Sequence, residues 1–153
     1  MVTRPATSHG PAERLLEIEA IQQLKARYFR LMDTKDWGGL ARVFTADAEL
    51  DVTDDAGRDA GRVTGGGEAI AASIERAVGT ARTVHHGHMP EIELTSSDTA
   101  RGVWAMFDYV EWPSEADRVG FRGYGHYTET YRKVDGEWRI ASLKLTRLRR
   151  DPL

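Results

Sequence analysis

Four long strand-like stretches follow one another in the second half of the chain, and this succession constrains the fold more than any other feature. They cover residues 83–95, 100–112, 119–133 and 137–147. Short polar turns separate them, and the last turn, Asp135-Gly136, is a strong hairpin signal. A meander of strands that comes after helices predicts an α+β fold and not a doubly wound parallel sheet.

Helical patterns occupy the first half of the chain. From Ala12 to about Asp33, apolar residues recur at three- and four-residue steps, as they do on one face of a helix. Asp36 can cap a short second helix over Trp37 to Phe44. A third helix begins at residues 65–68, Gly-Gly-Gly-Glu. Glycines before a helix could hold a phosphate, but no lysine-and-hydroxyl pair of the P-loop type follows, so we expect a flexible turn.

A length of 153 residues suits one domain with a single core. We expect that domain over residues 12–148, with a disordered segment before it at 1–11 and a tail after it at 149–153. Between the helices, residues 48–52 read as a strand and the polar residues 53–60 as the turn of a hairpin.

The charge of the chain excludes some partners. The net charge is −3 and the isoelectric point is about 6.0, so no basic field exists to attract nucleic acid or an anionic membrane. We expect the basic residues Arg147, Arg149 and Arg150 to be solvated. Without cysteine there is no disulfide, thiolate nucleophile or thiolate metal site. The chain has neither a signal peptide nor an apolar run of roughly 20 residues, which predicts a soluble, cytoplasmic protein.

One carboxylate is predicted on an apolar strand face. Because strand side chains alternate, Asp108 shares its side of the strand with Trp104, Met106, Val110 and Trp112. A charge on such a face must be paired, protonated or open to a wet cavity. Two interpretations stay open: a pocket residue, or a structural aspartate bonded to a neighbouring strand or to an arginine.

Three histidines lie close together at the start of one predicted strand. Histidine exchanges protons near neutral pH, and a carboxylate that fixes its tautomer makes it a usable base. Gly87 and Pro90 disturb the alternation, so the pattern alone does not say which of His85, His86 and His88 faces inward. A zinc site needs three or four converging ligands, and no second group at ligand spacing accompanies the histidines, so we expect no metal.

Tyr28 and Asp33 close the long predicted helix. Five residues on an ideal helix are about 140° of rotation, so the two side chains do not share a face. They converge only if the helix ends or unwinds near Met32. The alternative is a core tyrosine and a surface aspartate.

These motifs, in this order, resemble the SnoaL-like branch of the nuclear transport factor 2-like superfamily. The resemblance spans residues 17–146 and is carried by four runs, 21–37 (IQQLKARYFRLMDTKDW), 85–92 (HHGHMPEI), 102–108 and 127–138 (YTETYRKVDGEW). Within that branch the chain resembles the bile acid 7α-dehydratases most closely. It resembles scytalone dehydratases and hexachlorocyclohexane dehydrochlorinases more distantly.

The resemblance implies a cone-shaped fold, in which a curved mixed sheet wraps around the N-terminal helices and encloses a deep apolar pocket. It implies a catalytic role for Tyr28 and His85, with Asp33 supporting the histidine and Asp108 as a further polar pocket residue. The chain departs from the bile acid enzymes at Val52, where they have tyrosine, and over residues 112–119. Both differences bear on the substrate more than on the chemistry.

We therefore expect a lyase of the dehydratase type that acts on a hydrophobic cyclic, steroid- or polyketide-like substrate without cofactor or metal. His88, Trp104, Met106 and Tyr127 are expected to contact the substrate. An isomerase or cyclase is the second interpretation, and a non-catalytic small-molecule-binding protein is the third, since one scaffold serves several functions. An apolar outer sheet face and the resemblance predict a homo-oligomer, with a trimer favoured over a dimer.

Overall fold

The computed structural model describes residues 10–53, 61–114 and 117–153. Three helices and six strands are assigned within these ranges. The helices are α1 (Pro11–Asp33), α2 (Trp37–Arg42) and α3 (Gly66–Val78). The strands are β1 (Phe44–Asp51), β2 (Arg62–Val63), β3 (Arg82–Leu94), β4 (Thr99–Glu111), β5 (Phe121–Val134) and β6 (Glu137–Pro152).

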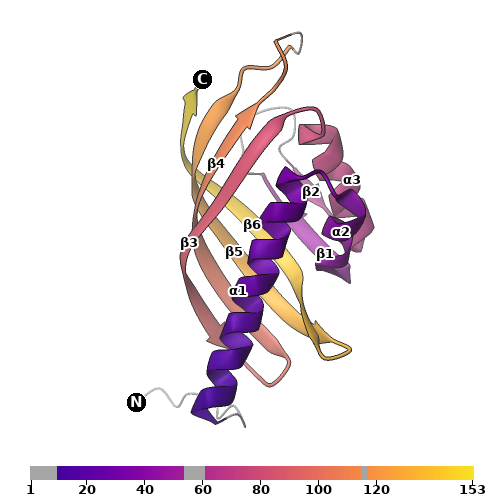
Figure 1. Ribbon diagram of the computed structural model, residues 1–153. Helices are drawn as coiled ribbons and strands as arrows, with labels where there is room; N and C mark the ends of the chain where they lie inside the picture. Colours follow the sequence, from indigo (N-terminus) through magenta and orange to yellow (C-terminus); the bar gives the residue numbers. More distant parts are fainter. Residues whose placement is uncertain (1–9, 54–60, 115–116) are drawn as a thin grey trace.

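The described strands form one six-stranded sheet in the order β2-β1-β6-β5-β4-β3. Neighbouring strands are antiparallel except β1 and β6, which are parallel, so the sheet is mixed. Figure 1 shows the long strands bending around α1, with α2 and α3 beside β1 and β2. This arrangement confirms the predicted α+β fold with a curved mixed sheet around the N-terminal helices.

The main core lies between α1 and the sheet. The apolar stripe of α1 buries Ile21, Leu24 and Tyr28 against residues of several strands. The strand residues in this core are Phe44, Ala48, Leu50, Leu94, Ala100, Trp104, Met106, Tyr127, Tyr131, Trp138, Ile140, Leu143 and Leu145. A second, smaller cluster joins Ala81, Val110 and Phe121 at the other end of the long strands. No helix in the described ranges is long and apolar enough to cross a membrane.

Several boundaries differ from the sequence expectations. α2 ends at Arg42, not at Phe44, because Phe44 begins β1 and pairs with Ile140. The predicted turn over 53–60 falls mostly outside the described residues. β6 continues to Pro152, so residues 149–152 are the end of a strand paired with β5 and not a tail. At the other terminus α1 already begins at Pro11, and the Gly10 N–H donates to Glu13 at 2.8 Å.

Backbone conformation and close packing explain the three consecutive glycines at residues 65–67. Gly65 and Gly66 have φ of +104° and +80°, which favours glycine. A Cβ on Gly66 would lie 2.1 Å from the carbonyl oxygen of Ala46, and one on Gly67 would lie 2.0 Å from that of Ala41. The glycines therefore let the start of α3 lie directly against β1 and α2. Backbone contact explains the run without a phosphate.

Candidate active site

An aspartate and a histidine meet where α1 ends beside β3. The Nδ1 atom of His85 lies 2.6 Å from Oδ1 of Asp33, and the backbone N–H of His85 donates to Oδ2 at 2.9 Å. The hydroxyl of Thr83 donates to the same carboxylate at 2.9 Å. A carboxylate that accepts from Nδ1–H leaves Nε2 of a neutral imidazole without a proton, so Nε2 can accept one.

The carboxylate of Asp33 is held in its charged form. Its burial would by itself raise its pKa, but the hydrogen bonds from His85 and Thr83 and the charge of the imidazolium outweigh that effect and lower the pKa below its usual value. Lys35 stands behind this group and donates from Nζ to the hydroxyl of Thr83 at 2.9 Å. The site therefore has a permanent negative charge behind the histidine at neutral pH.

Alternation along β3 fixes which histidine faces inward. His85 is largely buried, whereas His86 and His88 are exposed on the outer face, where their rings stack on each other. The irregularity in the strand pairing falls between His88 and Glu91, after the three histidines. The alternation of faces is therefore regular through the three histidines, and the side chain of His85 points toward α1.

A cavity of about 320 Å³ lies next to this pair. Small-molecule sites span roughly 300–1,000 Å³, so the cavity is of the size that holds a small organic ligand. Its polar wall includes Tyr28, His85, Asp108, Tyr127 and Arg147. The apolar wall consists of Met32, Leu50, Val52, Ile74, Ala77, Val78, Val110, Trp112, Val119, Phe121, Leu143 and Leu145.

Tyr28 and Asp33 reach the site in different ways. Tyr28 is buried and lines the cavity directly. Asp33 is not part of the wall, but its carboxylate contacts His85, which is. Burial raises the pKa of Tyr28 well above its usual value, and the charges of Glu129, Asp108 and Asp33 add to the effect. The phenol therefore stays protonated and can donate a hydrogen bond into the cavity. The two residues need not share a helix face, so α1 does not have to unwind.

Asp108 lines the cavity in a buried ion pair with Arg147. Nη1 and Nη2 of Arg147 donate to the carboxylate at 2.7 and 2.8 Å, and the side chains of Asp108 and Arg147 are 3% and 8% exposed. The two residues come from β4 and β6, on either side of β5. They meet because Gly123 lies between them: a Cβ there would be 2.1 Å from Arg147 and 2.2 Å from Asp108. The expectation that Arg147 is solvated is wrong.

Replacing Gly123 by alanine should therefore displace this ion pair. Filling a packed site in this way costs about 1–3 kcal/mol of unfolding free energy, which urea denaturation would measure. Gly38→Ala is the matched control, because a Cβ there meets nothing closer than 3.7 Å and should leave stability unchanged or slightly higher. Equal unfolding midpoints for wild type and Gly123→Ala would contradict the role assigned to this glycine.

Three residues expected to contact substrate lie elsewhere. His88 is on the exposed outer face of the sheet. Trp104 and Met106 are buried and share the face of Asp108, but they are not part of the cavity wall. The indole of Trp104 donates to the Tyr131 hydroxyl at 2.8 Å. The rings of Phe29 and Trp104 both lie against Gly87, where a Cβ would come within 2.7 Å of Phe29 and 3.1 Å of Trp104. Of the four expected contacts, Tyr127 lines the cavity.

A buried lysine beneath the cavity was missed. Lys25 and Glu129 form an ion pair in which both side chains are 0% exposed, and Tyr131 also donates to Glu129. The ammonium lies 4.1 Å from the ring centre of Tyr28 and 3.8 Å from that of Tyr127. The signal was the position of Lys25 within the apolar stripe of the helix, four residues after Ile21.

Comparison with known proteins identifies the family. Residues 13–144 match the SnoaL-like domain. A protein of Gibberella zeae named a probable cyclase is 26% identical over 136 residues, which cover 84% of this chain and 89% of the relative.

Solved structures share the fold. A hexachlorocyclohexane dehydrochlorinase superposes with a TM-score of 0.79 at 23% identity, covering 94% of this chain and 93% of the other. A Novosphingobium aromaticivorans protein provisionally named a scytalone dehydratase gives 0.77 at 24% identity, covering 92% and 89%. The closer resemblance to bile acid 7α-dehydratases stays a prediction. Because the family match covers most of the chain and the fold is shared, the protein belongs to the SnoaL-like domain family of the nuclear transport factor 2-like superfamily.

Proposed function

We propose that this protein is a cofactor-independent lyase of the dehydratase type, with His85 as the base that removes a proton from carbon. The observation that carries the proposal is the Asp33–His85 pair, 2.6 Å apart, at the wall of a largely apolar cavity that Tyr28 also lines. A base, a group that orients it and a hydrogen-bond donor on one cavity are the parts that such a reaction requires.

In the proposed reaction Nε2 of His85 takes the proton from a C–H made acidic by a neighbouring carbonyl or ring. The charge of Asp33 stabilises the imidazolium that forms. Tyr28, protonated because of its raised pKa, donates a hydrogen bond to the developing oxyanion or to the departing hydroxyl, and the His85 imidazolium gives its proton to that hydroxyl, which leaves as water. Asp108 accepts from both Nη1 and Nη2 of Arg147, so we assign it the positioning of that arginine rather than a proton relay.

The relatives support an enzyme of the lyase or isomerase type. Their names, a dehydrochlorinase, a scytalone dehydratase and a cyclase, describe eliminations and a ring closure, which one positioned base can serve. The apolar wall of the cavity favours a hydrophobic cyclic substrate, of steroid- or polyketide-like character. An isomerase or cyclase is the second candidate, favoured by the relative named a cyclase. Product mass separates the two, because only dehydration loses water.

Replacing Asp33 by asparagine should lower kcat/KM roughly 10²-fold or more, through a misoriented imidazole. In the wild type, kcat/KM should fall as pH drops through the interval where histidines titrate, about pH 5–8. A pH series on the true substrate measures both effects.

Asp98→Asn is the control for that series, since Asp98 lies exposed in the turn between β3 and β4 and loses the same charge. It should leave both the rate and the acid limb unchanged. A wild-type profile that is flat from about pH 5 to 8 would exclude His85 as the base.

We also propose that the protein is a homo-oligomer, a trimer in preference to a dimer, and that it works in the cytoplasm on a small molecule. The outer sheet face exposes Val84, Met89, Tyr124 and Leu148, and exposed apolar groups of this kind favour an interface. Light scattering at micromolar concentration should give a multiple of 17.1 kDa, three for the trimer. A mass of 17.1 kDa would rule out an oligomer under those conditions.

A further inference from the structure

Two polar residues that are not part of the described cavity wall form a hydrogen-bonded chain to the Asp33–His85 pair. Lys35 donates from Nζ to the hydroxyl of Thr83 at 2.9 Å, and that hydroxyl donates to Oδ1 of Asp33 at 2.9 Å. The same Oδ1 lies 2.6 Å from Nδ1 of His85. The proton transfer proposed above gives neither Thr83 nor Lys35 a role.

The hydrogen bonds of this chain all run toward the carboxylate. Asp33, whose pKa lies below its usual value, is charged, and a carboxylate only accepts hydrogen bonds. Thr83 therefore gives its single hydroxyl proton to Asp33, and its oxygen accepts from Lys35. Thr83 is buried and β-branched, so packing and a restricted χ1 angle hold its hydroxyl in place. The backbone N–H of His85 holds the other carboxylate oxygen at 2.9 Å.

The backbone of Lys35 has a conformation that favours glycine. Its φ is +62°, in the left-handed region. Its N–H donates to the Met32 carbonyl at 3.2 Å. The next N–H, that of Asp36, donates to the Leu31 carbonyl at 2.9 Å, which completes the Schellman pattern at the end of α1. Glycine is the usual residue at this position, so lysine strains the backbone there, and strain of this kind indicates a functional use of the side chain.

We propose that Thr83 and Lys35 are positioning residues that fix the Asp33 carboxylate and thereby keep the proton of neutral His85 on Nδ1. Nε2 is then the unprotonated nitrogen, the one that takes the proton from the substrate in the proposed reaction. Without the Thr83 hydroxyl the carboxylate is less restrained, and a neutral imidazole exchanges between its two tautomers. The role in catalysis rests on the function proposed above, whereas the tautomer is observable without any turnover.

NMR of the histidine ring nitrogens in the isotope-labelled full chain tests the Thr83 hydroxyl. Above about pH 8 the imidazoles are neutral, and their ring signals distinguish the two tautomers. The signals of His85 are those that His85→Asn removes. The wild type should show the proton on Nδ1, Thr83→Val should show a mixture of both tautomers, and Thr83→Ser, which keeps the hydroxyl, should restore Nδ1–H.

Thr130→Val is the matched control for the hydroxyl. Thr130 is an exposed residue of β5, and its hydroxyl is bonded to that of Ser142 at 2.6 Å. The control therefore also removes a hydrogen-bonded strand hydroxyl, but one outside the site, and it should keep the wild-type tautomer.

Lys35→Gly separates positioning from a purely structural role. The Lys35 ammonium also lies 5.6 Å from the ring centre of Trp37, and a cation near a helix C-terminus is favourable. Glycine removes the side chain but relieves the positive φ. For a positioning residue, the urea midpoint should stay equal or rise while the preference for Nδ1–H weakens. A lower midpoint with an unchanged tautomer would instead mean that Lys35 only stabilises the helix end.

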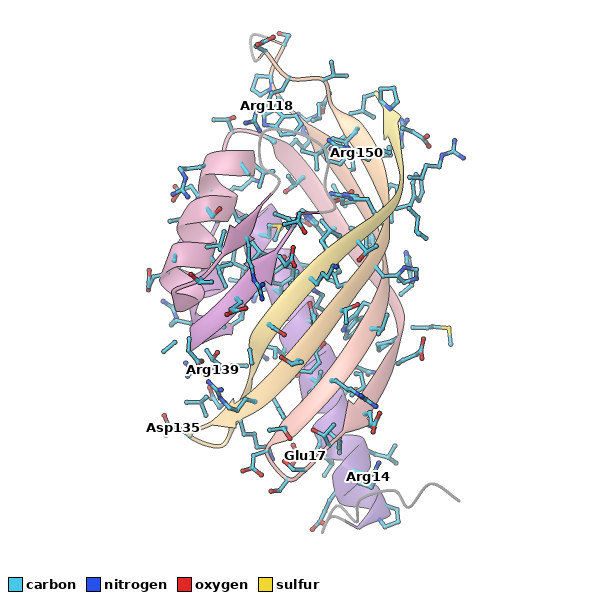
Figure 2. All side chains as sticks on the ribbon, turned by 180° about the vertical axis from the view of Figure 1, so that it is seen from behind. Arg14, Glu17, Arg118, Asp135, Arg139 and Arg150 are labelled. Atoms are coloured by element: carbon cyan, nitrogen blue, oxygen red, sulfur yellow. The ribbon has the colours of Figure 1, made fainter. Side chains whose placement is uncertain are left out.

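Asp135→Gly is the control for the backbone change. Asp135 also has a positive φ, +52°, in the turn between β5 and β6. Figure 2 shows it at the same end of the molecule as Arg14, near the start of α1, whereas Lys35 follows the end of that helix. This variant should keep the wild-type tautomer.

Kinetics on an identified substrate supply the second readout. Thr83→Val should lower kcat roughly tenfold, because the base is less well oriented, and should leave KM near the wild-type value, because the cavity wall is unchanged. Thr83→Ser should recover most of the loss.

The positioning role is overturned if Thr83→Val or Lys35→Gly keeps the wild-type tautomer, or if either control variant loses it to the same extent. An active enzyme in which Thr83→Val keeps both the tautomer and kcat would defeat the positioning role alone. A tautomer that responds as expected, in a protein whose activity is unaffected by His85→Ala, would defeat the proposed mechanism alone.

Discussion

Replacing His85 by alanine should lower kcat/KM by about three orders of magnitude, within the roughly 10²–10⁴-fold that a positioned general base supplies. The variant removes the one imidazole found in the cavity wall among the described residues, and it leaves the carboxylate of Asp33 without its 2.6 Å partner. KM should change little, because the apolar wall that holds the substrate body stays intact. Steady-state kinetics on a substrate identified by mass spectrometry of bound ligand would measure the loss.

The chain offers an internal control for this experiment. His88 lies three residues further along β3 and is exposed on the outer face of the sheet, so His88→Ala should keep kcat/KM near the wild-type value. A large loss in both variants would indicate damage to β3 rather than removal of a base. Near-normal turnover of His85→Ala would mean that the proposed mechanism is wrong and that another group takes the proton.

The long strands were predictable because their signals are local. Alternation and turn residues placed β3 and β4 within one residue of their observed ends. β6 was predicted too short, because its last residues are in strand only through pairing with β5 as far as Pro152 with Phe121. The two-residue β2 has no pattern of its own and exists through its pairing with β1.

The inward-facing histidine could not be chosen from the sequence for a similar reason. Gly87 allows a bulge that would have reversed the faces, but the structure has it in regular register opposite Met106. Its missing side chain makes room for Phe29 of α1 instead. A glycine that serves packing and a glycine that marks a bulge look the same in one sequence.

The paired charges were missed because each pair is long-range. Asp108 and Arg147 lie on strands separated by β5, so their contact depends on strand order and on Gly123. The strand pattern left open an arginine partner for Asp108, but the short basic run that contains Arg147 indicated a solvated side chain. Short charge runs are solvated on average, but this tendency says nothing about the burial of one residue in the run. Arg147 lies in the cavity wall.

Removing the charge of Glu129 should destabilise the fold severely. Glu129→Gln leaves the Lys25 ammonium fully buried without its counter-charge, and loss of one partner of a buried pair costs about 3–5 kcal/mol. Glutamine can still accept from Tyr131, so the lost charge is the main change. Urea denaturation should show a lower midpoint. The exposed pair between Glu93 and Arg101 is the control, and Glu93→Gln should cost less than about 1 kcal/mol.

The pH dependence of the unfolding free energy of Glu129→Gln tests whether the buried lysine causes the loss of stability. Burial lowers the pKa of Lys25, and in the wild type the charge of Glu129 and its hydrogen bond oppose that effect. Without Glu129 the folded state favours neutral lysine, while the unfolded chain keeps the proton up to about pH 10.4. The unfolded state then binds more protons, so the stability of Glu129→Gln should rise as pH increases toward that value.

Replacing both partners supplies the decisive comparison. Lys25→Met combined with Glu129→Gln removes the buried charge altogether, and exchanging a buried pair for neutral groups of similar volume is often neutral or stabilising. The double variant should therefore regain most of the stability that Glu129→Gln loses. Its stability should also no longer rise toward high pH. If the losses instead add, Glu129 stabilises the fold through packing and its bond from Tyr131, and the buried lysine is not the source of the cost.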